Sequence, residues 1–322
     1  MTDNTNQQLN KRKLIVLTGP TAVGKTDLSL RLAKAVNGEI ISADSIQVYK
    51  HFNIGSAKIM PDEMQGVRHH LIDVLEPSDD FSVADFKQMA NVAMDEIYSR
   101  GHIPIITGGT GFYIQAVLKD IDFTEDEDDG YRSSLEQLAA EKGAEYLHDM
   151  LATIDPESAD SIHANNVKRV IRALEYYHQT GCKISEHNKT ESVKESPYNF
   201  AYFVLDCDRA TLYERIEKRV DIMLDNGLVD EVKELVAKYG VTRDMVSMQG
   251  LGYKEILQYL EGETTLEEAV YILKRDTRHF AKRQLTWFKR EKDVIRVDKD
   301  TLLTEDEQMD FILKILKDKN II

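Results

Sequence analysis

Cysteine is scarce in this chain. The 322 residues include two cysteines, Cys182 and Cys207, and neither belongs to a CxxC pair. No histidine or cysteine cluster has metal-ligand spacing either, so we expect neither a disulfide framework nor a zinc site. Both thiols are expected to be buried.

Long hydrophobic runs are also missing. No apolar stretch approaches the roughly 18 residues that a membrane helix needs, and the polar start MTDNTNQQLNKRK has no apolar signal-peptide core. The composition, 42% hydrophobic and 30% charged, is that of a soluble globular protein. We therefore expect a cytoplasmic protein with no membrane partner, and a monomer.

Positive charge is in deficit, and it is unevenly placed. The formal net charge of −15 argues against a protein that coats nucleic acid without selectivity. The segment 274–292 nevertheless carries eight Lys or Arg residues against two acids, and Lys168, Arg169 and Arg172 share one side of a predicted helix. These two basic groups are either solvated helix faces or contacts for a polyanion.

The stretch LTGPTAVGKT fits the phosphate-binding pattern GxxxxGK[ST]. It follows a short apolar run and opens a helical pattern, which is the context that this motif requires. Backbone N–H groups of such a loop bind phosphate oxygens, the lysine neutralises them, and the final hydroxyl can ligate Mg²⁺. The loop residues are Gly19, Pro20, Thr21, Ala22, Val23, Gly24, Lys25 and Thr26.

Alternating strands and helices predict an α/β fold, a P-loop NTPase-like parallel sheet flanked by helices. The predicted strands are 14–17, 39–43, 102–107, 200–205 and 294–297. We expect the first helix to end at Gly38, and later helices to be capped by Ser82 with Asp85 and by Thr304 with Glu307. On the last long helix, Leu273, Phe280 and Trp287 recur every seven residues, which predicts a buried stripe.

Strand signals disappear between residues 123 and 197, which predicts an inserted all-helical subdomain. The expected division is a catalytic core of residues 1–122 and 198–322 and a helical insertion of residues 123–197.

Ligands of parallel α/β sheets bind at the carboxyl ends of the strands. Asp44 ends the second predicted strand, and Gly108 to Gly111, with the Thr110 hydroxyl, follow the third. Asp44 is a candidate general base or outer magnesium ligand, or else a turn aspartate. Arg219 could reach phosphates from a helix, or it could be a solvated helix arginine.

Six motifs, in this order, resemble those of the tRNA dimethylallyltransferase family, also called tRNA isopentenyltransferases. They are GPTAVGKT, DSIQVY, GGTGFY, RALEYY, GLGYKE and KRQLTWF. The resemblance covers residues 14 to 288. It implies transfer of the dimethylallyl group from dimethylallyl diphosphate to the N6 amino group of the adenosine 3′ of the anticodon, in tRNAs reading UNN codons, with Mg²⁺ as cofactor.

The resemblance also implies roles for residues. Thr21 to Thr26 would hold the diphosphate, with Thr26 a ligand of Mg²⁺ and Arg219 assisting. Asp44 would accept the amino proton. The residues implied to grip the flipped-out adenosine are Asp44, Ser45, Ile46, Gln47 and Thr110. Those implied to bind the anticodon stem-loop are Arg132, Lys168, Arg169, Val170, Ile171 and Arg172.

Three other functions remain open from the residues alone. The phosphate-binding loop by itself favours a small-molecule kinase. A non-catalytic RNA-binding module is a second alternative, and isopentenyl transfer to free adenine nucleotides is a third. The helical insertion and the basic faces favour RNA over a free nucleotide as acceptor.

Overall fold

The computed structural model describes residues 11–123 and 129–322. These residues form two compact units. The larger unit comprises the described residues up to Leu118 together with Pro197–Ile322, and the smaller unit is Lys119–Ser196. The sequence had suggested residues 123 and 197 as the limits of the smaller unit.

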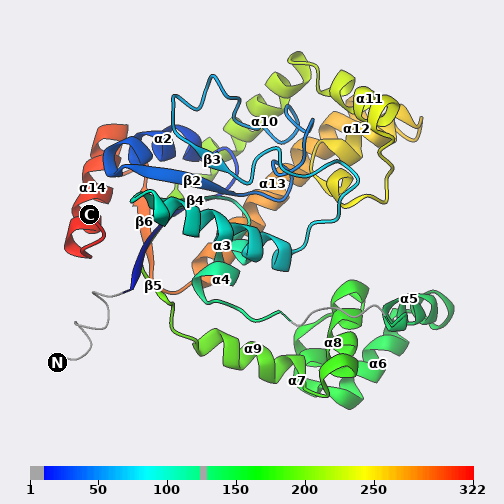
Figure 1. Ribbon diagram of the computed structural model, residues 1–322. Coiled ribbons are helices and arrows are strands. Elements are labelled where there is room, and N and C mark those ends of the chain that lie inside the picture. Colours follow the sequence, from blue (N-terminus) through cyan, green and yellow to red (C-terminus); the bar gives the residue numbers. More distant parts are fainter. Residues whose placement is uncertain (1–10, 124–128) are drawn as a thin grey trace. The chain divides into compact units, whose positions relative to one another are not determined.

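A six-stranded sheet forms the centre of the larger unit (Figure 1). Its strands are β1 (Arg12–Thr18), β2 (Gly38–Ala43), β3 (His69–His70), β4 (Ile103–Gly108), β5 (Tyr198–Asp206) and β6 (Val294–Asp298). The order is β3-β2-β4-β1-β5-β6, and every named strand pair is parallel. The α/β fold with a parallel sheet is thus confirmed. The two-residue strand β3 has no counterpart among the predicted strands.

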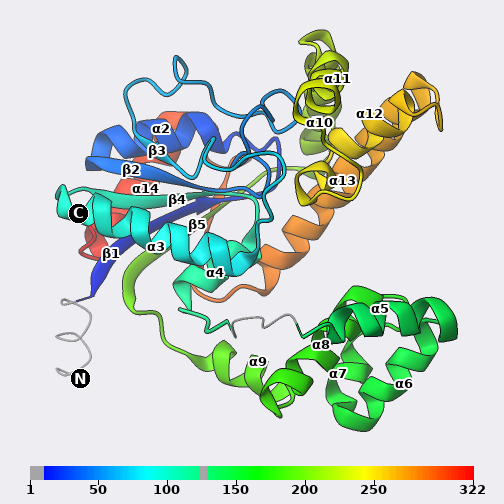
Figure 2. The same ribbon diagram turned by 45° about the vertical axis from the view of Figure 1, so that its right-hand side comes forward.

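Helices cover both faces of the sheet, because both faces of its strands are apolar. On one side lie α2 (Lys25–Val36) and α14 (Glu305–Asp318), and on the other α3 (Val83–Ser99) and α4 (Gly111–Leu118), as Figure 2 shows. Successive residues of β1 alternate between the two cores. Ile15 belongs to the core with α2, and Leu14 to the core with α3.

The predicted helix caps at Ser82 and Thr304 are confirmed. Both residues form capping boxes, with Asp85 and Glu307 respectively. Gly38 is not the residue that stops the first helix. Helix α2 ends at Val36, its C-cap is Asn37, whose φ of 51° lies in the left-handed region that asparagine tolerates, and Gly38 already belongs to β2.

The rest of the larger unit is helical: α10 (Arg209–Asp225), α11 (Leu228–Tyr239), the 3₁₀ turn η1 (Val246–Gln249), α12 (Tyr253–Leu260) and α13 (Leu266–Arg290). Helix α13 packs against α10, α12 and α4. The prediction of a buried stripe is wrong for two of its three residues. Leu273 is buried, but Phe280 and Trp287 are half-buried, and Phe280 lines a cavity.

The smaller unit consists of α5 (Tyr131–Lys142), α6 (Ala144–Ile154), α7 (Pro156–Ser161), α8 (Val167–Thr180) and α9 (Ile184–Val193). These helices have a hydrophobic core of their own, in which Leu147, Leu151 and Leu174 are fully buried. Buried Asp155 joins two helices, because its carboxylate accepts hydrogen bonds from the hydroxyls of Ser158 on α7 and Ser185 on α9.

A buried carboxylate connects strands β2 and β3 to the segment before β4. Glu39 lies 2.7 Å from His70 Nε2 and 2.6 Å from His102 Nδ1, and accepts two hydrogen bonds of 2.8 Å from Arg100. Burial alone would raise the pKa of Glu39, but these donors lower it to about 2. His70 therefore has a structural role as a partner of Glu39.

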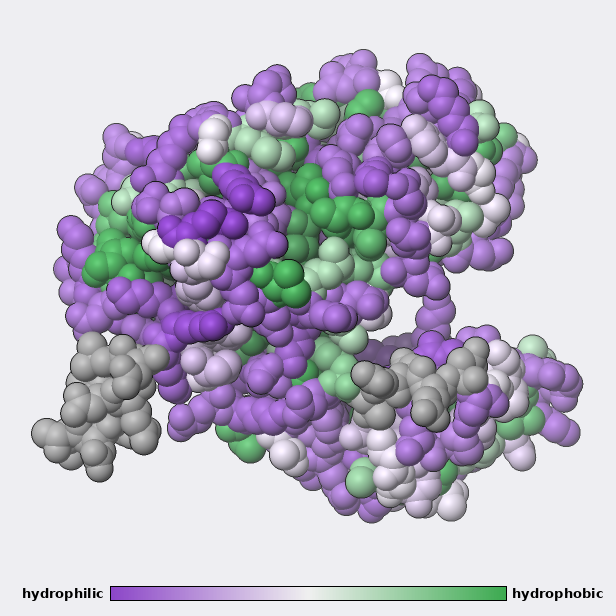
Figure 3. All heavy atoms as spheres, in the orientation of Figure 1, coloured by the Kyte–Doolittle hydropathy of each residue, from purple (hydrophilic) through white to green (hydrophobic). Residues whose placement is uncertain are grey.

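The face of the molecule drawn in Figure 3 is largely polar. In Figure 3 hydrophilic residues cover most of the visible face, and hydrophobic residues emerge in smaller patches. No helix within the described ranges is long and apolar enough to cross a membrane. Of the two cysteines, Cys207 is buried as expected, whereas Cys182 is exposed, so that expectation was wrong for Cys182.

Candidate active site

The loop between β1 and α2 is shaped by two glycines. Gly19 has a φ of 151°, and a Cβ there would lie 2.7 Å from the carbonyl oxygen of Leu205. Gly24 has a φ of 90° and stands at the N-cap of α2. The chain can therefore turn tightly and direct its N–H groups, together with the positive end of the helix dipole, toward one point.

Lys25 is folded back onto this loop. Its Nζ donates hydrogen bonds to the carbonyl oxygens of Gly19 at 3.0 Å and Pro20 at 2.8 Å. Burial, and to a smaller extent the positive charge of Arg219, lower the pKa of Lys25 to about 7, while Asp44 opposes the shift. An anion bound at the loop would restore the full charge of this lysine.

Asp44 lies at the end of β2 and has one carboxylate oxygen fixed by the backbone. Its Oδ1 accepts hydrogen bonds from the N–H groups of Ile46 at 2.9 Å and Gln47 at 3.2 Å. Asp44 is therefore a turn aspartate, and it also lines the cavity described below. Its role as a general base or magnesium ligand stays a prediction.

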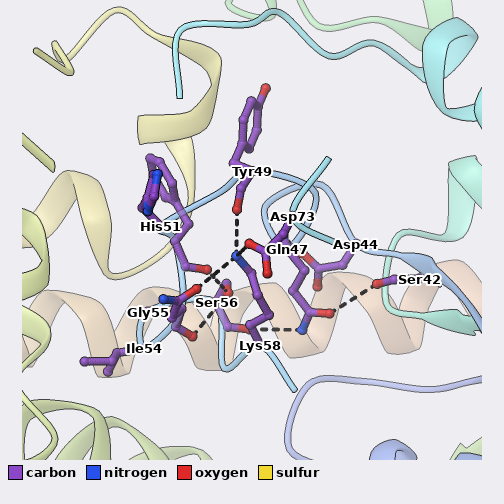
Figure 4. Close-up of polar contacts among 12 residues, drawn as sticks. Ser42, Asp44, Gln47, Tyr49, His51, Ile54, Gly55, Ser56, Lys58 and Asp73 are labelled. Carbon is purple, nitrogen blue, oxygen red and sulfur yellow. Dashed lines mark hydrogen bonds and ion pairs between the residues drawn. The ribbon is translucent and has the colours of Figure 1, made fainter. Parts of the chain in front are cut away.

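The loop after Asp44 is held by side chains that lie together in Figure 4. Gln47 accepts a hydrogen bond from the Ser42 hydroxyl and donates one to the carbonyl oxygen of Ser56. Lys58, whose side chain is 1% exposed, donates to the Tyr49 carbonyl oxygen at 2.6 Å and contacts the Asp73 carboxylate at 2.5 Å (Figure 4). Burial lowers the pKa of Lys58, although Asp73 counteracts this.

Thr110 lies in the short turn between β4 and α4. Its N–H donates to the Ala43 carbonyl oxygen at 3.3 Å, so the turn after β4 is joined to the end of β2. A Cβ on Gly108 would lie 2.2 Å from the same oxygen, so only glycine permits this approach. The Thr110 side chain is half-buried in the cavity wall.

Arg219 is not a solvated helix arginine. It projects from α10 into the cavity wall, and its buried Nε has no hydrogen-bond partner among the described residues. Burial lowers the pKa of Arg219, and the nearby carboxylate of Asp44 partly offsets this. A buried guanidinium nitrogen without a partner favours the binding of an anion beside it.

A cavity of about 620 Å³ within the larger unit brings these groups together. Its polar wall includes Thr21, Ala22, Gly24 to Thr26, Asp44 to Gln47, Thr110 and Arg219. Its apolar wall consists mainly of Ile216, Val220 and Met223 from α10 and of Leu273 and Phe280 from α13. Gly19, Pro20 and Val23 are outside the wall, and Val23 is fully buried in the core beside α2.

The sequence reading had missed several wall residues. Gln249 to Leu251 and Lys254 come from the GLGYKE region, and Arg283 and Gln284 from KRQLTWF. The motifs themselves were recognised, but their side chains were not assigned to the site. No short-range pattern indicated that these segments, more than 200 residues away, would meet the phosphate-binding loop.

The candidate metal ligand, the Thr26 hydroxyl, is exposed at the start of α2. Among residues 11–123 and 129–322, no group of three or more His, Cys, Asp or Glu side chains could hold a metal ion. One hydroxyl beside a phosphate-binding loop suits Mg²⁺, because this ion usually keeps several water ligands and takes its anionic ligands largely from substrate phosphates.

The candidate RNA contacts of the smaller unit fall into three classes. Lys168 and Arg169 are exposed on α8. Arg132 and Arg172 both bind the carboxylate of buried Glu175, at 2.6 and 3.1 Å. Val170 and Ile171 must be withdrawn as side-chain contacts, because they are 0% and 4% exposed in the hydrophobic core of this unit.

The fold and site define the class of protein: a parallel α/β protein in which a phosphate-binding loop, a fixed carboxylate and an unpaired arginine share one cavity. A sequence model of the IPP transferase family matches residues 47–291. A tRNA dimethylallyltransferase of Lachnoclostridium phytofermentans is 61% identical over 310 residues, covering 96% of this chain and 99% of that protein. The chain belongs to the IPP transferase family and is a transferase.

Solved structures agree with this assignment. The tRNA isopentenylpyrophosphate transferase of Bacillus halodurans is 45% identical, covers 96% of this chain and 98% of its own, and superposes with a TM-score of 0.71. A eukaryotic dimethylallyltransferase acting on tRNA is 30% identical, with a TM-score of 0.78 and coverage of 96% and 80%.

Proposed function

We propose that this protein prenylates tRNA, transferring the dimethylallyl group from dimethylallyl diphosphate to the N6 amino group of the adenosine 3′ of the anticodon in tRNAs reading UNN codons. The relatives named above are tRNA dimethylallyl or isopentenyl transferases. The observation that carries the proposal is the shared cavity, because its wall contains the phosphate-binding loop together with Asp44 and Thr110.

The donor binds with its diphosphate at Thr21 to Thr26. The loop N–H groups, Lys25 and Arg219 stabilise the negative charge that grows on the diphosphate as its bond to the allylic carbon breaks. The dimethylallyl group lies against the apolar wall formed by α10 and α13, which excludes water from the reacting carbon. The diphosphate leaves with the electron pair of the broken carbon–oxygen bond.

The acceptor is a weak nucleophile, because its nitrogen lone pair is conjugated with the purine ring. Asp44 takes the proton from the amino group as the new carbon–nitrogen bond forms. Its fixed Oδ1 orients the carboxylate, and Ser45 to Gln47 and Thr110 contact the adenosine. The base must leave its stack to enter the cavity, which costs a few kcal/mol and less in a loop than in a duplex.

The residues present fit Mg²⁺: the Thr26 hydroxyl would hold it, and it would help to neutralise the charge of the leaving diphosphate. The protein groups named here supply few other ligands. Mg²⁺ is therefore expected to bind together with the diphosphate rather than before it.

The smaller unit supplies the RNA contact away from the reacting base. Lys168 and Arg169 carry exposed charge on α8, which suits phosphate oxygens of an anticodon stem-loop. Arg132 and Arg172 have a second role, since each neutralises buried Glu175.

A single labelling assay tests the proposal. The protein is incubated with radiolabelled dimethylallyl diphosphate, Mg²⁺ and either an anticodon stem-loop RNA or AMP. Label in the RNA supports tRNA prenylation, and label in AMP alone would replace it by transfer to free nucleotides. Absence of label in both, with γ-phosphate transfer from ATP in a parallel reaction, would restore the kinase alternative.

A further inference from the structure

Gln284 on α13 connects two loops of the active site. Its side-chain amide accepts a hydrogen bond from the Thr21 N–H at Oε1, at 2.9 Å, and donates one from Nε2 to the Gly109 carbonyl oxygen, also at 2.9 Å. The residue is 6% exposed. One buried amide therefore joins the phosphate-binding loop to the turn that carries Thr110.

The Gln284 side chain links β1 and β4 beyond the point where their strand pairing stops. Strands β1 and β4 are paired up to Thr18 and Gly108, and the Thr18 hydroxyl still donates to the Gly108 carbonyl oxygen at 2.6 Å. Past that pair, β1 leads into the phosphate-binding loop and β4 into the turn before α4. Gln284 supplies one acceptor and one donor in a rigid planar group, so it fixes the two loops relative to each other.

Helix α13 approaches the turn closely enough to require glycine there. A Cβ on Gly109 would lie 2.2 Å from Gln284 Nε2, and a Cβ on Gly111 would lie 2.2 Å from Trp287 Nε1. Residues 284 and 287 are about one helical turn apart, so the same face of α13 contacts both glycines. The glycines of GGTG thus serve contact with α13, beyond the freedom of a simple turn.

We propose that Gln284 is a positioning residue that sets the separation between the diphosphate and the acceptor amine. The inference rests on the function proposed above, in which Thr21 holds the donor side and Thr110 the acceptor side. Reacting atoms must approach to about 3–3.5 Å, and a misplacement of about 1 Å can cost about 100-fold in rate. The two hydrogen bonds of the amide go to backbone groups of the two loops, so we expect it to act mainly on their geometry.

The first test replaces Gln284 by methionine, which has nearly the same shape but neither hydrogen bond. For Gln284→Met we expect kcat to fall about 10- to 100-fold, with KM for dimethylallyl diphosphate and for a stem-loop RNA within about threefold of wild type. The control is Thr286→Val on the same helix, because Thr286 is exposed and its hydroxyl donates to the Lys282 carbonyl oxygen within α13. It should keep wild-type kinetics. A Gln284→Met enzyme with wild-type kcat, or with a raised KM and unchanged kcat, overturns the proposal.

A second variant, Gln284→Glu, gives a pH dependence that a side chain acting only by its packing would not produce. When protonated, the side chain of Gln284→Glu can donate to Gly109 and accept from Thr21 as glutamine does, and when ionised it cannot donate. Burial against a carbonyl oxygen favours the protonated form. The ratio of variant to wild-type kcat should therefore rise at least threefold as the pH falls from 8 to 5.5. Lys25, Asp44, Arg219 and the other charged cavity groups are common to both proteins. A ratio that is constant with pH contradicts the proposal, even if the methionine variant fails to fold.

The two hypotheses fail in different ways. If the wild-type protein does not prenylate RNA, the proposed function is wrong. If wild type prenylates RNA while both Gln284 variants match it at every pH, only the positioning role is wrong.

Discussion

Lys168 and Arg169 should determine how strongly RNA binding depends on salt, while Arg172 should contribute less. Lys168 and Arg169 are exposed, and neither forms an ion pair within the described residues. Arg172 lies 3.1 Å from the carboxylate of Glu175, which it shares with Arg132. A cation that already neutralises a buried carboxylate releases fewer counterions when it meets a phosphate.

The expected magnitude follows from counterion release. Each phosphate contact contributes about 0.7 to the log–log salt slope for single-stranded RNA. Replacing both Lys168 and Arg169 by glutamine should therefore flatten the slope by about 1.4. Over a fourfold rise in salt, the affinity of the wild-type protein should therefore fall about sevenfold more than the affinity of the double variant.

Arg172→Gln should behave differently. Its slope should change by clearly less than about 0.7. Glu175 is 5% exposed, and hydrogen bonds from Arg132 and Arg172 lower its pKa although burial alone would raise it. Loss of one partner should thus destabilise the protein by about 1 kcal/mol, a figure reduced here because both arginines are partly exposed.

The assay is fluorescence anisotropy of a labelled anticodon stem-loop RNA from 50 to 400 mM KCl, with thermal unfolding of each variant. The control replaces Lys142, an exposed lysine elsewhere on the smaller unit, by glutamine, and is compared with Lys168→Gln, which removes the same charge. Equal slope changes in the control and the α8 variant would refute the reasoning, as would an Arg172 variant that changes the slope as much as Lys168→Gln alone.

Three further predictions concern single charged groups. Asp44→Asn keeps an oxygen for the Ile46 N–H but cannot accept a proton, so single-turnover prenylation should fall more than 1,000-fold with RNA affinity unchanged within about threefold; residual turnover near wild type would remove Asp44 as the base. Lys25→Met should abolish diphosphate binding measured by calorimetry. It should also raise the melting temperature of the free protein at pH 7. With a folded pKa near 7 and an unfolded value of about 10.5, Lys25 binds its proton more tightly in the unfolded state, so it destabilises the wild-type fold increasingly as the pH falls from about 10.5 to 7. The gain should therefore shrink between pH 7 and 10, and a gain that is constant with pH would contradict the assignment. Glu39→Gln should destabilise the protein at pH 7, and the difference should vanish as the pH falls from about 4.5 to 2, because the lowered pKa of Glu39 stabilises the fold only above that window; urea unfolding at pH 7 and pH 3 measures it.

Much of the fold could be predicted because its signals are local. The apolar runs of β1, β2, β4, β5 and β6, and the capping boxes at Ser82 and Thr304, depend on residues within a few positions of one another. The phosphate-binding loop was likewise recognisable, since its two glycines and Lys25 act within eight residues. Strand β3 escaped because two residues carry no periodicity.

The roles of single side chains could not be predicted in the same way. Val170 and Lys168 are two positions apart on a basic segment, yet one is in a core and the other is exposed. The sequence left Arg219 open as a phosphate contact or a solvated helix residue, and only the packing of α10 against the rest of the unit places it in a cavity wall.

By itself, then, the sequence determined the parallel α/β architecture, the phosphate-binding loop and the acidic residue at a strand end. Only the tertiary structure decided that Gln284 would bond to Thr21, 263 residues away, and to Gly109. The physical reason is range. Backbone conformation follows from neighbouring side chains, whereas the partner of a buried polar group is chosen by whichever distant segment packing brings within hydrogen-bond distance.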